Sequence, residues 1–311
     1  MIRLATVADA PVLHRLIHEA FAARPVVDPP AEALGDTVDD IAAGLASPDW
    51  GLLATVDGEP AGCLMVRRVA PADAPGRPAA LLRRVSVAPP FRHHGLAGRL
   101  VRHAVCRAAD EGVRRLLVMA RAELPDVLAW WDRYGFALDH AVSHGYILGL
   151  DLAAPVSAPT AEAMCDLGVA LAGRLRAGDL VVANGELGAG KTTLAQGIAA
   201  GLGVERPVLS PTFVLSRVHP SRSGGVAFVH ADAYRLGSAA EVDDLDLDAS
   251  ADGAVTYVEW GAGLVEQLAD SRLDVTIVRS GDPEDATRTV YLVGVGPRWA
   301  GEDLGTEDRT R

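Results

Sequence analysis

The stretch NGELGAGKTT, Asn184–Thr193, contains the only lysine of the 311-residue chain, whereas the other 28 of its 29 basic side chains are arginine. The apolar segment DLVVA precedes the stretch. The segment KTTLAQGIAAGLG begins with the last three residues of the stretch and continues beyond it, with apolar residues at helical spacing. The single lysine therefore lies between an expected strand and an expected helix, at the one basic position where the chain does not use arginine.

The glycines of this stretch explain the choice of cation. Gly185, Gly190, Lys191 and Thr192 match the phosphate-binding pattern GxxxxGK[ST]. Glycines let successive backbone N–H groups curl around phosphate oxygens, and the helix N-terminus adds partial positive charge. Lysine supplies a compact charge on a thin stem, whereas the guanidinium of arginine is bulkier and differently directed. We predict that the following residues bind a nucleotide: Gly185, Glu186, Leu187, Gly188, Ala189, Gly190, Lys191, Thr192 and Thr193.

Length and composition suggest about two domains, at roughly 150 residues each. The segment AAPVSAPT, 153–160, is small, uncharged and proline-containing, as linkers are. We therefore expect domains over 1–152 and 161–298, followed by a polar tail over 299–311 that is disordered from Gly301 onward. We find no internal repeat.

Charge and cysteine content restrict the partners and the compartment. Residues 1–152 carry 16 Arg and 18 Asp plus Glu, net −2, whereas residues 153–311 carry 13 basic and 23 acidic groups, net −10. Lys and Arg clusters drive binding to phosphate backbones, so the second half is a poor binder of DNA or RNA on its own. The sequence shows no signal peptide and no run of about 18 apolar residues, and its three cysteines lack metal-type spacing. We expect a reduced, cytoplasmic protein that does not enter a membrane.

Strand and helix patterns alternate in both halves, which predicts an α/β fold for each. In the first half we expect a strand over IRLATV, a helix over ADAPVLHRLIHEAFAA and a hairpin turning at Asp57-Gly58. A strand (ALLRRVSVA), a helix (GLAGRLVRHAVCRAADEG), a strand (RRLLVMA), a helix (LPDVLAWWDRYGF) and a last strand pair follow. In the second half we expect a helix from about Thr160, then the phosphate-binding unit, then strands over VAFVHAD and VTYVEW.

Three segments follow the glycine-rich loop in order: SPTF (Ser210–Phe213), HADAYR (His230–Arg235) and VEWG (Val258–Gly261). Together with GELGAGKTT they resemble the TsaE family, the P-loop ATPase subunit of bacterial tRNA threonylcarbamoyladenosine synthesis. The resemblance covers about residues 160–298 and implies a P-loop NTPase-type α/β domain that binds ATP and Mg²⁺. It also implies TsaB- and TsaD-like partner subunits, with tRNA reached only through their complex.

Two carboxylates, Asp232 and Glu259, each follow an apolar strand, where P-loop folds place groups that meet metal and water. By the resemblance, Thr192 and Glu259 hold Mg²⁺. Asp232 orients or activates the attacking water, and we name Asp232 and Lys191 as catalytic. The alternative for Asp232 is a helix or turn cap.

The resemblance extends the ATP contacts to Thr160, Thr212 and Trp260, with Thr212 as a nucleotide-sensing switch. The alternative role for Trp260 is packing in the core instead of contact with ATP. The acidic run EVDDLDLD, Glu241–Asp248, is interpreted as a solvated helix face, with contact to a basic partner as the alternative. A small-molecule kinase is the rival function, but only 65 residues separate Thr193 from Glu259, which leaves little room for a lid.

The first half contains a second loop of phosphate-binding type. A strand ends at Ala88-Pro89, and Arg92-His93-His94-Gly95-Leu96-Ala97 opens a helix. This loop, together with AWWDRYGF (Ala129–Phe136), resembles the GNAT acetyltransferases and implies a mixed sheet whose splayed strands admit CoA. Backbone N–H groups at the helix start point at the pyrophosphate. The implied acetyl-CoA residues are Val87, Arg92, His93, His94, Gly95, Leu96, Ala97 and Gly98.

The acid and base of such an enzyme are not evident. Many members have a tyrosine at the position of Trp131, and an indole N–H cannot protonate a thiolate. Tyr134 lies three residues further on, but no motif places it, and Arg83 and Arg84 stand on the preceding strand instead of a carboxylate. The possible bases are histidines that also suit surface or packing roles: His14, His18, His140 and His144. An N-acetyltransferase and a CoA-binding or scaffold module therefore both remain as hypotheses.

Overall fold

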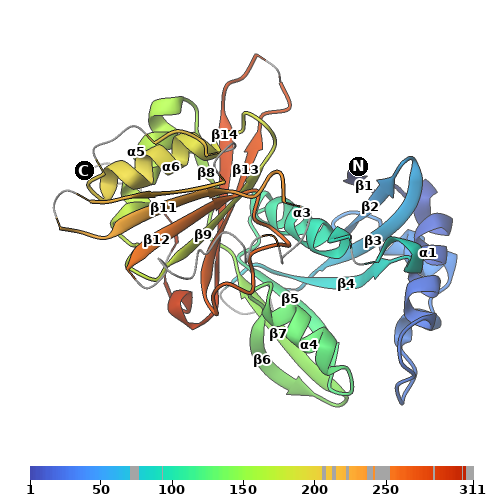
Figure 1. The fold of residues 1–311 in the computed structure, drawn as a ribbon. Coiled ribbons are helices and arrows are strands. Elements are labelled where there is room, and N and C mark those ends of the chain that lie inside the picture. The colour runs from blue at the N-terminus through green and yellow to red at the C-terminus, as the bar shows by residue number, and fades with distance from the viewer. Residues whose placement is uncertain are drawn as a thin grey trace. The chain divides into compact units, whose positions relative to one another are not determined.

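The computed structural model describes residues 1–70, 77–92, 94–204, 208–211, 215–221, 224–236, 241, 253–282, 284–302 and 304–305. The chain divides into two units, Met1–Leu152 and Ala153–Arg311, and each contains one seven-stranded sheet (Figure 1). Within the described residues, no helix has the length and apolar character needed to cross a membrane.

The first unit has the strand order β1-β2-β3-β4-β5-β7-β6. Its strands are β1 (Ile2–Leu4), β2 (Trp50–Val56), β3 (Glu59–Arg68), β4 (Ala79–Val87), β5 (Arg115–Arg121), β6 (Ala137–Val142) and β7 (Gly145–Asp151). Its helices are α1 (Ala10–Ala22), α2 (Val38–Ala43), α3 (Leu96–Asp110) and α4 (Pro125–Asp132), with short 3-10 turns η1 (Val7–Asp9), η2 (Glu32–Leu34) and η3 (Pro89–Phe91). The β2–β3 hairpin turns at Asp57 and Gly58, as predicted, and both have positive φ.

Strands β4 and β5 are the parallel pair of this sheet, and they pair over only part of their length. Their register runs from Ala79 opposite Arg115 to Leu82 opposite Val118, and no pairing follows it. The register of β4 against β3 also shifts there, and Arg84 adopts φ 53. The residues of β4 after Leu82 therefore pair with β3 but not with β5, and they lead into the loop predicted to bind CoA.

The second unit has the strand order β10-β11-β12-β9-β13-β14-β8. Its strands are β8 (Val156–Ala158), β9 (Leu180–Gly185), β10 (Ser216–His219), β11 (Ala227–Asp232), β12 (Ala254–Glu259), β13 (Arg272–Arg279) and β14 (Arg288–Val295). Its helices are α5 (Ala161–Ala172) and α6 (Lys191–Gly201), with the 3-10 turn η4 (Pro297–Trp299). The four central strands, β11, β12, β9 and β13, are parallel, so the carboxyl ends of β9, β11 and β12 meet at one edge.

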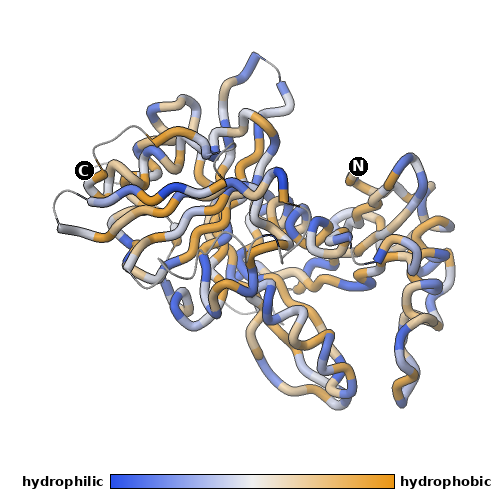
Figure 2. The backbone as a smooth tube through the Cα atoms, in the orientation of Figure 1, coloured by the Kyte–Doolittle hydropathy of each residue, from blue (hydrophilic) through white to orange (hydrophobic). Residues whose placement is uncertain are grey.

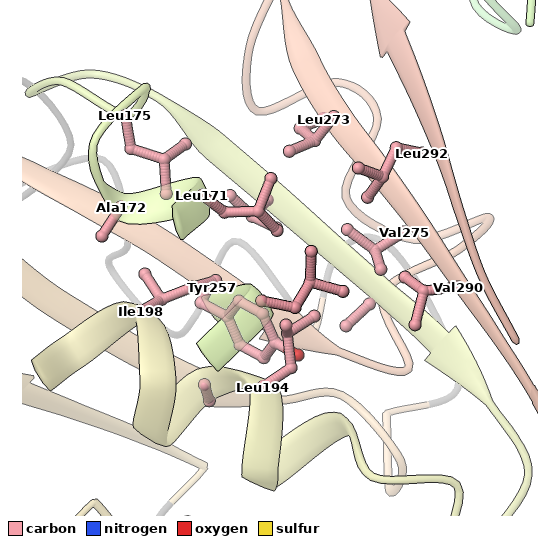
Figure 3. Packing of buried hydrophobic residues seen from close by; sticks show 14 of the residues in the cluster. Leu171, Ala172, Leu175, Leu194, Ile198, Tyr257, Leu273, Val275, Val290 and Leu292 are labelled. Atoms are coloured by element: carbon pink, nitrogen blue, oxygen red, sulfur yellow. The ribbon is translucent and has the colours of Figure 1, made fainter. Parts of the chain in front are cut away.

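Helices α5 and α6 cover one face of this sheet (Figure 1), and the core lies beneath them. Figure 3 shows Leu194 and Ile198 of α6 beside Tyr257 of β12, with Val275 of β13 and Leu292 of β14 further along the sheet. The central strands are hydrophobic because both of their faces are covered (Figure 2). This packing fixes the start of α6 against the sheet.

Two boundary predictions were wrong. Residues 153–160 are not a linker throughout, because β8 pairs antiparallel with β14 and its Ala158 is buried in the core of the second unit. The segment after 298 is not a free polar tail, because Trp299 and Leu304 pack into the same core. Residues 306–311 lie outside the described part of the chain. Burial of these apolar side chains explains both corrections.

Candidate functional site

The loop between β9 and α6 has the backbone expected of a phosphate cradle. Gly188 and Gly190 adopt φ 74 and φ 105, and Gly190 is the N-cap of α6. A Cβ on Gly188 would meet no atom within 4 Å, so the space over the loop is open. At Gly185 a Cβ would come within 2.6 Å of the Ile277 carbonyl oxygen on β13. Gly188 and Gly190 are therefore required by their left-handed backbone conformation, and Gly185 is required by the close approach of β13.

Lys191 begins α6 and is buried with its ammonium inside the loop. Its Nζ donates to the carbonyl oxygens of Gly185 and Glu186 at 2.9 and 3.0 Å, and it lies 3.8 Å from the ring centroid of Trp260. Burial lowers the pKa of the ammonium, and the charges of Glu259 and Asp232 oppose this effect. The lysine charge is thus held at the loop by groups that a phosphate could replace.

Thr192 and Glu259 meet at the carboxyl edge of the sheet. The Thr192 hydroxyl donates to Glu259 Oε1 at 2.7 Å, and Glu259 is only 4% exposed. A hydroxyl and a carboxylate are hard oxygen ligands of the kind that Mg²⁺ selects, with waters and phosphates completing its shell. No group of three or more His, Cys, Asp or Glu side chains suited to a metal gathers in the described part of the chain. The Thr192–Glu259 pair fits the predicted Mg²⁺ site.

His230 also belongs to this arrangement. The sequence did not lead us to predict it as a site residue, although it is the first residue of the segment HADAYR. Its Nε2 lies 2.9 Å from the same Oε1 of Glu259, and its ring is fully buried between strands. Because a carboxylate only accepts, we infer that Nε2 carries the proton. Nδ1 is buried with no hydrogen-bond partner in the described structure, which fits an unprotonated nitrogen. Side-chain alternation along β11 was the available signal, since it places His230 on the same face as Asp232.

Asp232 ends β11 directly opposite Glu259 in the register of the parallel strands. Its Oδ2 accepts from the Ser210 hydroxyl at 3.1 Å, and its Oδ1 accepts from the Tyr234 backbone N–H at 2.9 Å. The carboxylate is thus both a turn cap and a member of the site. Its link to Ser210 connects it to the SPTF segment, of which Thr212 lies outside the described residues.

Trp260 follows β12 with φ 61, and its N–H donates to the Ala183 carbonyl at 2.9 Å. Its ring covers Lys191 and lies 5.1 Å from the ring of Tyr234. Thr160 is exposed and caps α5 by accepting from the Ala163 N–H at 3.1 Å, so its hydroxyl serves the helix. The structure therefore brings Trp260 to the loop and gives Thr160 a capping role.

The second predicted loop lies between β4 and α3. Gly95 adopts φ 65 as the N-cap of α3, with open space where a Cβ would stand. The N–H groups of the first turn, at Leu96, Ala97 and Gly98, have no intrahelical acceptor. The Arg92 guanidinium instead donates to the Ala20 carbonyl at 3.0 Å and so ties the loop to α1. His94 is exposed, and His93 lies outside the described residues.

Tyr134 contacts this loop, and no sequence motif predicted the contact. A Cβ built on Gly98 would lie 1.9 Å from the Tyr134 hydroxyl, so the phenol rests directly on the first turn of α3. Trp131, at the position where many GNAT members have tyrosine, is 4% exposed and packs edge-to-face on Phe136 at 4.8 Å. The hydroxyl near the loop is therefore that of Tyr134, while Trp131 belongs to the core.

The candidate bases have structural partners. His14 and His18 stack with centroids 4.2 Å apart, and the Nε2 of each lies within 3.2 Å of the Asp36 carbonyl oxygen. Arg84 makes a bidentate ion pair with the Asp36 carboxylate at 2.6 and 3.0 Å. His140 contacts Asp139 on an exposed strand, and His144 is exposed. These contacts favour packing roles for His14 and His18 and surface roles for His140 and His144.

Comparison with known proteins assigns both units. Residues 158–290 match the family profile described as "Threonylcarbamoyl adenosine biosynthesis protein TsaE". The tRNA threonylcarbamoyladenosine biosynthesis protein TsaE of Streptomyces coelicolor is 54% identical over 143 residues, which cover 45% of this chain and 97% of that protein. The chain belongs to the TsaE family. The TsaE protein of Mycobacterium tuberculosis is 49% identical over 138 residues, which cover 42% of this chain and 82% of that protein.

A GNAT domain precedes the TsaE domain, because residues 16–136 match the profile described as "Acetyltransferase (GNAT) family". The solved structure of PaiA N-acetyltransferase from Thermoplasma acidophilum in complex with coenzyme A is 14% identical. The match covers 49% of this chain and 98% of that chain, with a TM-score of 0.42. The two profile matches confirm the predicted layout, a GNAT domain followed by a TsaE domain, and the α/β fold class is confirmed. The TsaE relatives support a role in tRNA threonylcarbamoyladenosine biosynthesis.

Proposed function

We propose that the TsaE domain binds and hydrolyses ATP with Mg²⁺, as a subunit of a tRNA-modifying complex. The observation that carries this proposal is the Thr192–Glu259 hydrogen bond beside the buried Lys191 ammonium. Phosphate oxygens would replace the Gly185 and Glu186 carbonyls as acceptors of Lys191. Bound at Thr192 and Glu259, Mg²⁺ would neutralise charge on the phosphates.

Asp232 is the candidate to orient the attacking water, because it is the other carboxylate at this edge of the sheet. The water oxygen forms a bond to the γ-phosphorus, the bond between that phosphorus and the ADP oxygen breaks, and the water proton leaves to the surroundings. His230 holds the Glu259 carboxylate in place throughout. Trp260 keeps the face of Lys191 away from water.

The complex that uses this hydrolysis would contain TsaB- and TsaD-like subunits. The acidic balance of residues 153–311 supports contact with tRNA through those partners instead of directly. We expect slow hydrolysis by the isolated chain and acceleration by the partners. Phosphate release from the purified chain, alone and with both subunits, tests this, with Lys191→Ala as the inactive control. Fast hydrolysis without partners would count against the proposal.

We further propose that the GNAT domain binds acetyl-CoA at the start of α3 and transfers the acetyl group to an amine. The amine nitrogen bonds to the thioester carbonyl carbon, the C–S bond breaks, and the amine loses the proton that the thiolate gains. Tyr134 is the candidate donor to the thiolate, because its hydroxyl lies on Gly98.

Calorimetric titration of acetyl-CoA into the full chain tests this domain, with Gly95→Glu as the control that fills the open space over the loop. Binding that Gly95→Glu abolishes supports the loop as a CoA site, and loss of turnover with retained CoA binding in Tyr134→Phe supports the acid. A folded chain that binds no acetyl-CoA would leave a scaffold domain attached to the ATPase.

A further inference from the structure

A cavity in the first unit lies between the end of α1 with the segment that follows it and the end of β5. Its volume is about 120 Å³, close to the roughly 150 Å³ of a cavity that takes a benzene molecule. One wall comes from the segment that follows α1, and the other comes from the end of β5 and the start of α4. The apolar side chains of the walls are Phe21, Val27 and Leu124, with the exposed Val26 and Leu34 at the rim, so the cavity is open to solvent. The cavity therefore suits one aliphatic or aromatic group.

Two guanidinium groups stand in these walls, and their surroundings differ. Arg121 forms an ion pair with Glu123 at 2.6 Å and donates to the carbonyls of Asp28 and Pro29. Within the described residues, Arg24 donates to the Val85 carbonyl at 2.9 Å, and its guanidinium lies 3.9 Å from the centroid of the Phe21 ring. No carboxylate of the described residues forms an ion pair with Arg24, which is half-buried.

Of the two guanidinium charges in the cavity wall, that of Arg121 is thus paired with a carboxylate and that of Arg24 is not, among the described residues. Burial lowers the pKa of this guanidinium to about 10, with the nearby charge of Arg92 adding to the effect. Burying a cation without an anion costs free energy that a bound anion would recover. A guanidinium is also the group that best matches a carboxylate, since it can donate two parallel hydrogen bonds.

The position of the cavity relates it to the second loop. Arg24 donates to the carbonyl of Val85, in the part of β4 that does not pair with β5, and Arg92 of the loop donates to the Ala20 carbonyl near the end of α1. Both the cavity and the second loop therefore contact the end of α1 and the end of β4.

We propose that this cavity binds the acetyl acceptor, and that the acceptor is a small amine bearing a carboxylate and an apolar side chain. The carboxylate pairs with Arg24, and the side chain fills the cavity. The role of the ligand as acetyl acceptor rests on the proposed acetyltransferase activity. The binding of a carboxylate at Arg24 does not depend on that activity.

Calorimetry with the full chain tests the inference, using N-acetyl-L-leucine and N-acetyl-L-leucinamide as product-like probes. We expect the acid to bind at least about tenfold more tightly than the amide, because a hydrogen-bonded charge pair is lost in the amide. Arg24→Gln should remove this preference, and Arg15→Gln, an exposed arginine of α1 paired with Glu19, should retain it. Equal binding of acid and amide, or no binding of either, would overturn the inference.

Titrating acetyl-CoA into the same samples separates the two proposals. Binding of the acid without binding of acetyl-CoA would refute the acetyltransferase proposal and leave the carboxylate site standing. Titrating free CoA into the chain loaded with the acid is the second arm, because CoA lacks the acetyl group that the probe already carries, and simultaneous binding of CoA and the acid is the expected result. Displacement of the acid by free CoA would assign Arg24 to the CoA site and overturn the acceptor assignment.

Discussion

His230 offers the sharpest test of the TsaE site, because among the described residues its Nε2 has a partner and its Nδ1 has none. His230→Gln keeps an N–H donor near the position of Nε2, whereas His230→Asn puts its donor near Nδ1, where the described part of the chain offers no acceptor. If Nε2 orients Glu259 for Mg²⁺, the glutamine variant should resemble the parent and the asparagine variant should not.

The size of the effect follows from the bond that is lost. A hydrogen bond to a buried carboxylate contributes about 1.5–3 kcal/mol, which corresponds to a factor of roughly 10–150 in an equilibrium constant. Groups that hold metal ligands in place contribute about 10–100-fold to metal affinity. We therefore expect His230→Asn to raise the Mg²⁺ concentration for half-maximal ATP binding at least about tenfold.

The assay is calorimetric binding of a non-hydrolysable ATP analogue at a series of Mg²⁺ concentrations. Thermal unfolding of the nucleotide-free proteins serves as the control for a general loss of stability. If the Gln and Asn variants shift the Mg²⁺ dependence equally, or if neither does, His230 does not position Glu259 and the reasoning fails.

The other predictions concern the packing of the two units. Gly168→Ala should destabilise the second unit by about 1–3 kcal/mol or more, because its Cβ would lie 2.6 Å from the Leu194 carbonyl oxygen. Gly173→Ala at the C-cap of the same helix, where the nearest atom is 3.5 Å away, should be neutral or stabilising, and equal melting temperatures for the two variants would contradict this. Burial raises the pKa of the Cys63 and Cys106 thiols, to about 12 at Cys106, so both stay protonated at pH 8. Thiol labelling of the native chain should modify Cys165 alone, and rapid reaction of more than one thiol would be the contrary result.

The P-loop could be predicted from the sequence because its chemistry is local. The spacing from Gly185 to Thr192 fixes which backbone and side-chain groups face a phosphate, and the structure places them on one strand–loop–helix unit. The meeting of Asp232 and Glu259 at one edge of the sheet could also be predicted, because each ends an apolar run and parallel strands align their carboxyl ends.

The missed features depend on contacts between distant segments. The pairing of β8 with β14, the burial of Trp299 and the resting of Tyr134 on Gly98 join residues that no local pattern connects. The ion pair of Arg84 with Asp36 is likewise set by the loop after η2. His230 is different, since the alternation of side chains along β11 indicated its face.

The most direct test of the central claim is the level of threonylcarbamoyladenosine in tRNA from cells whose only copy of this chain carries Lys191→Arg. The reciprocal surface swap, Arg176→Lys, is the matched control, since Arg176 is exposed. We predict that Lys191→Arg lowers the modification strongly, because the guanidinium does not fit the loop, and that Arg176→Lys leaves it unchanged. Full modification in Lys191→Arg cells would contradict the account.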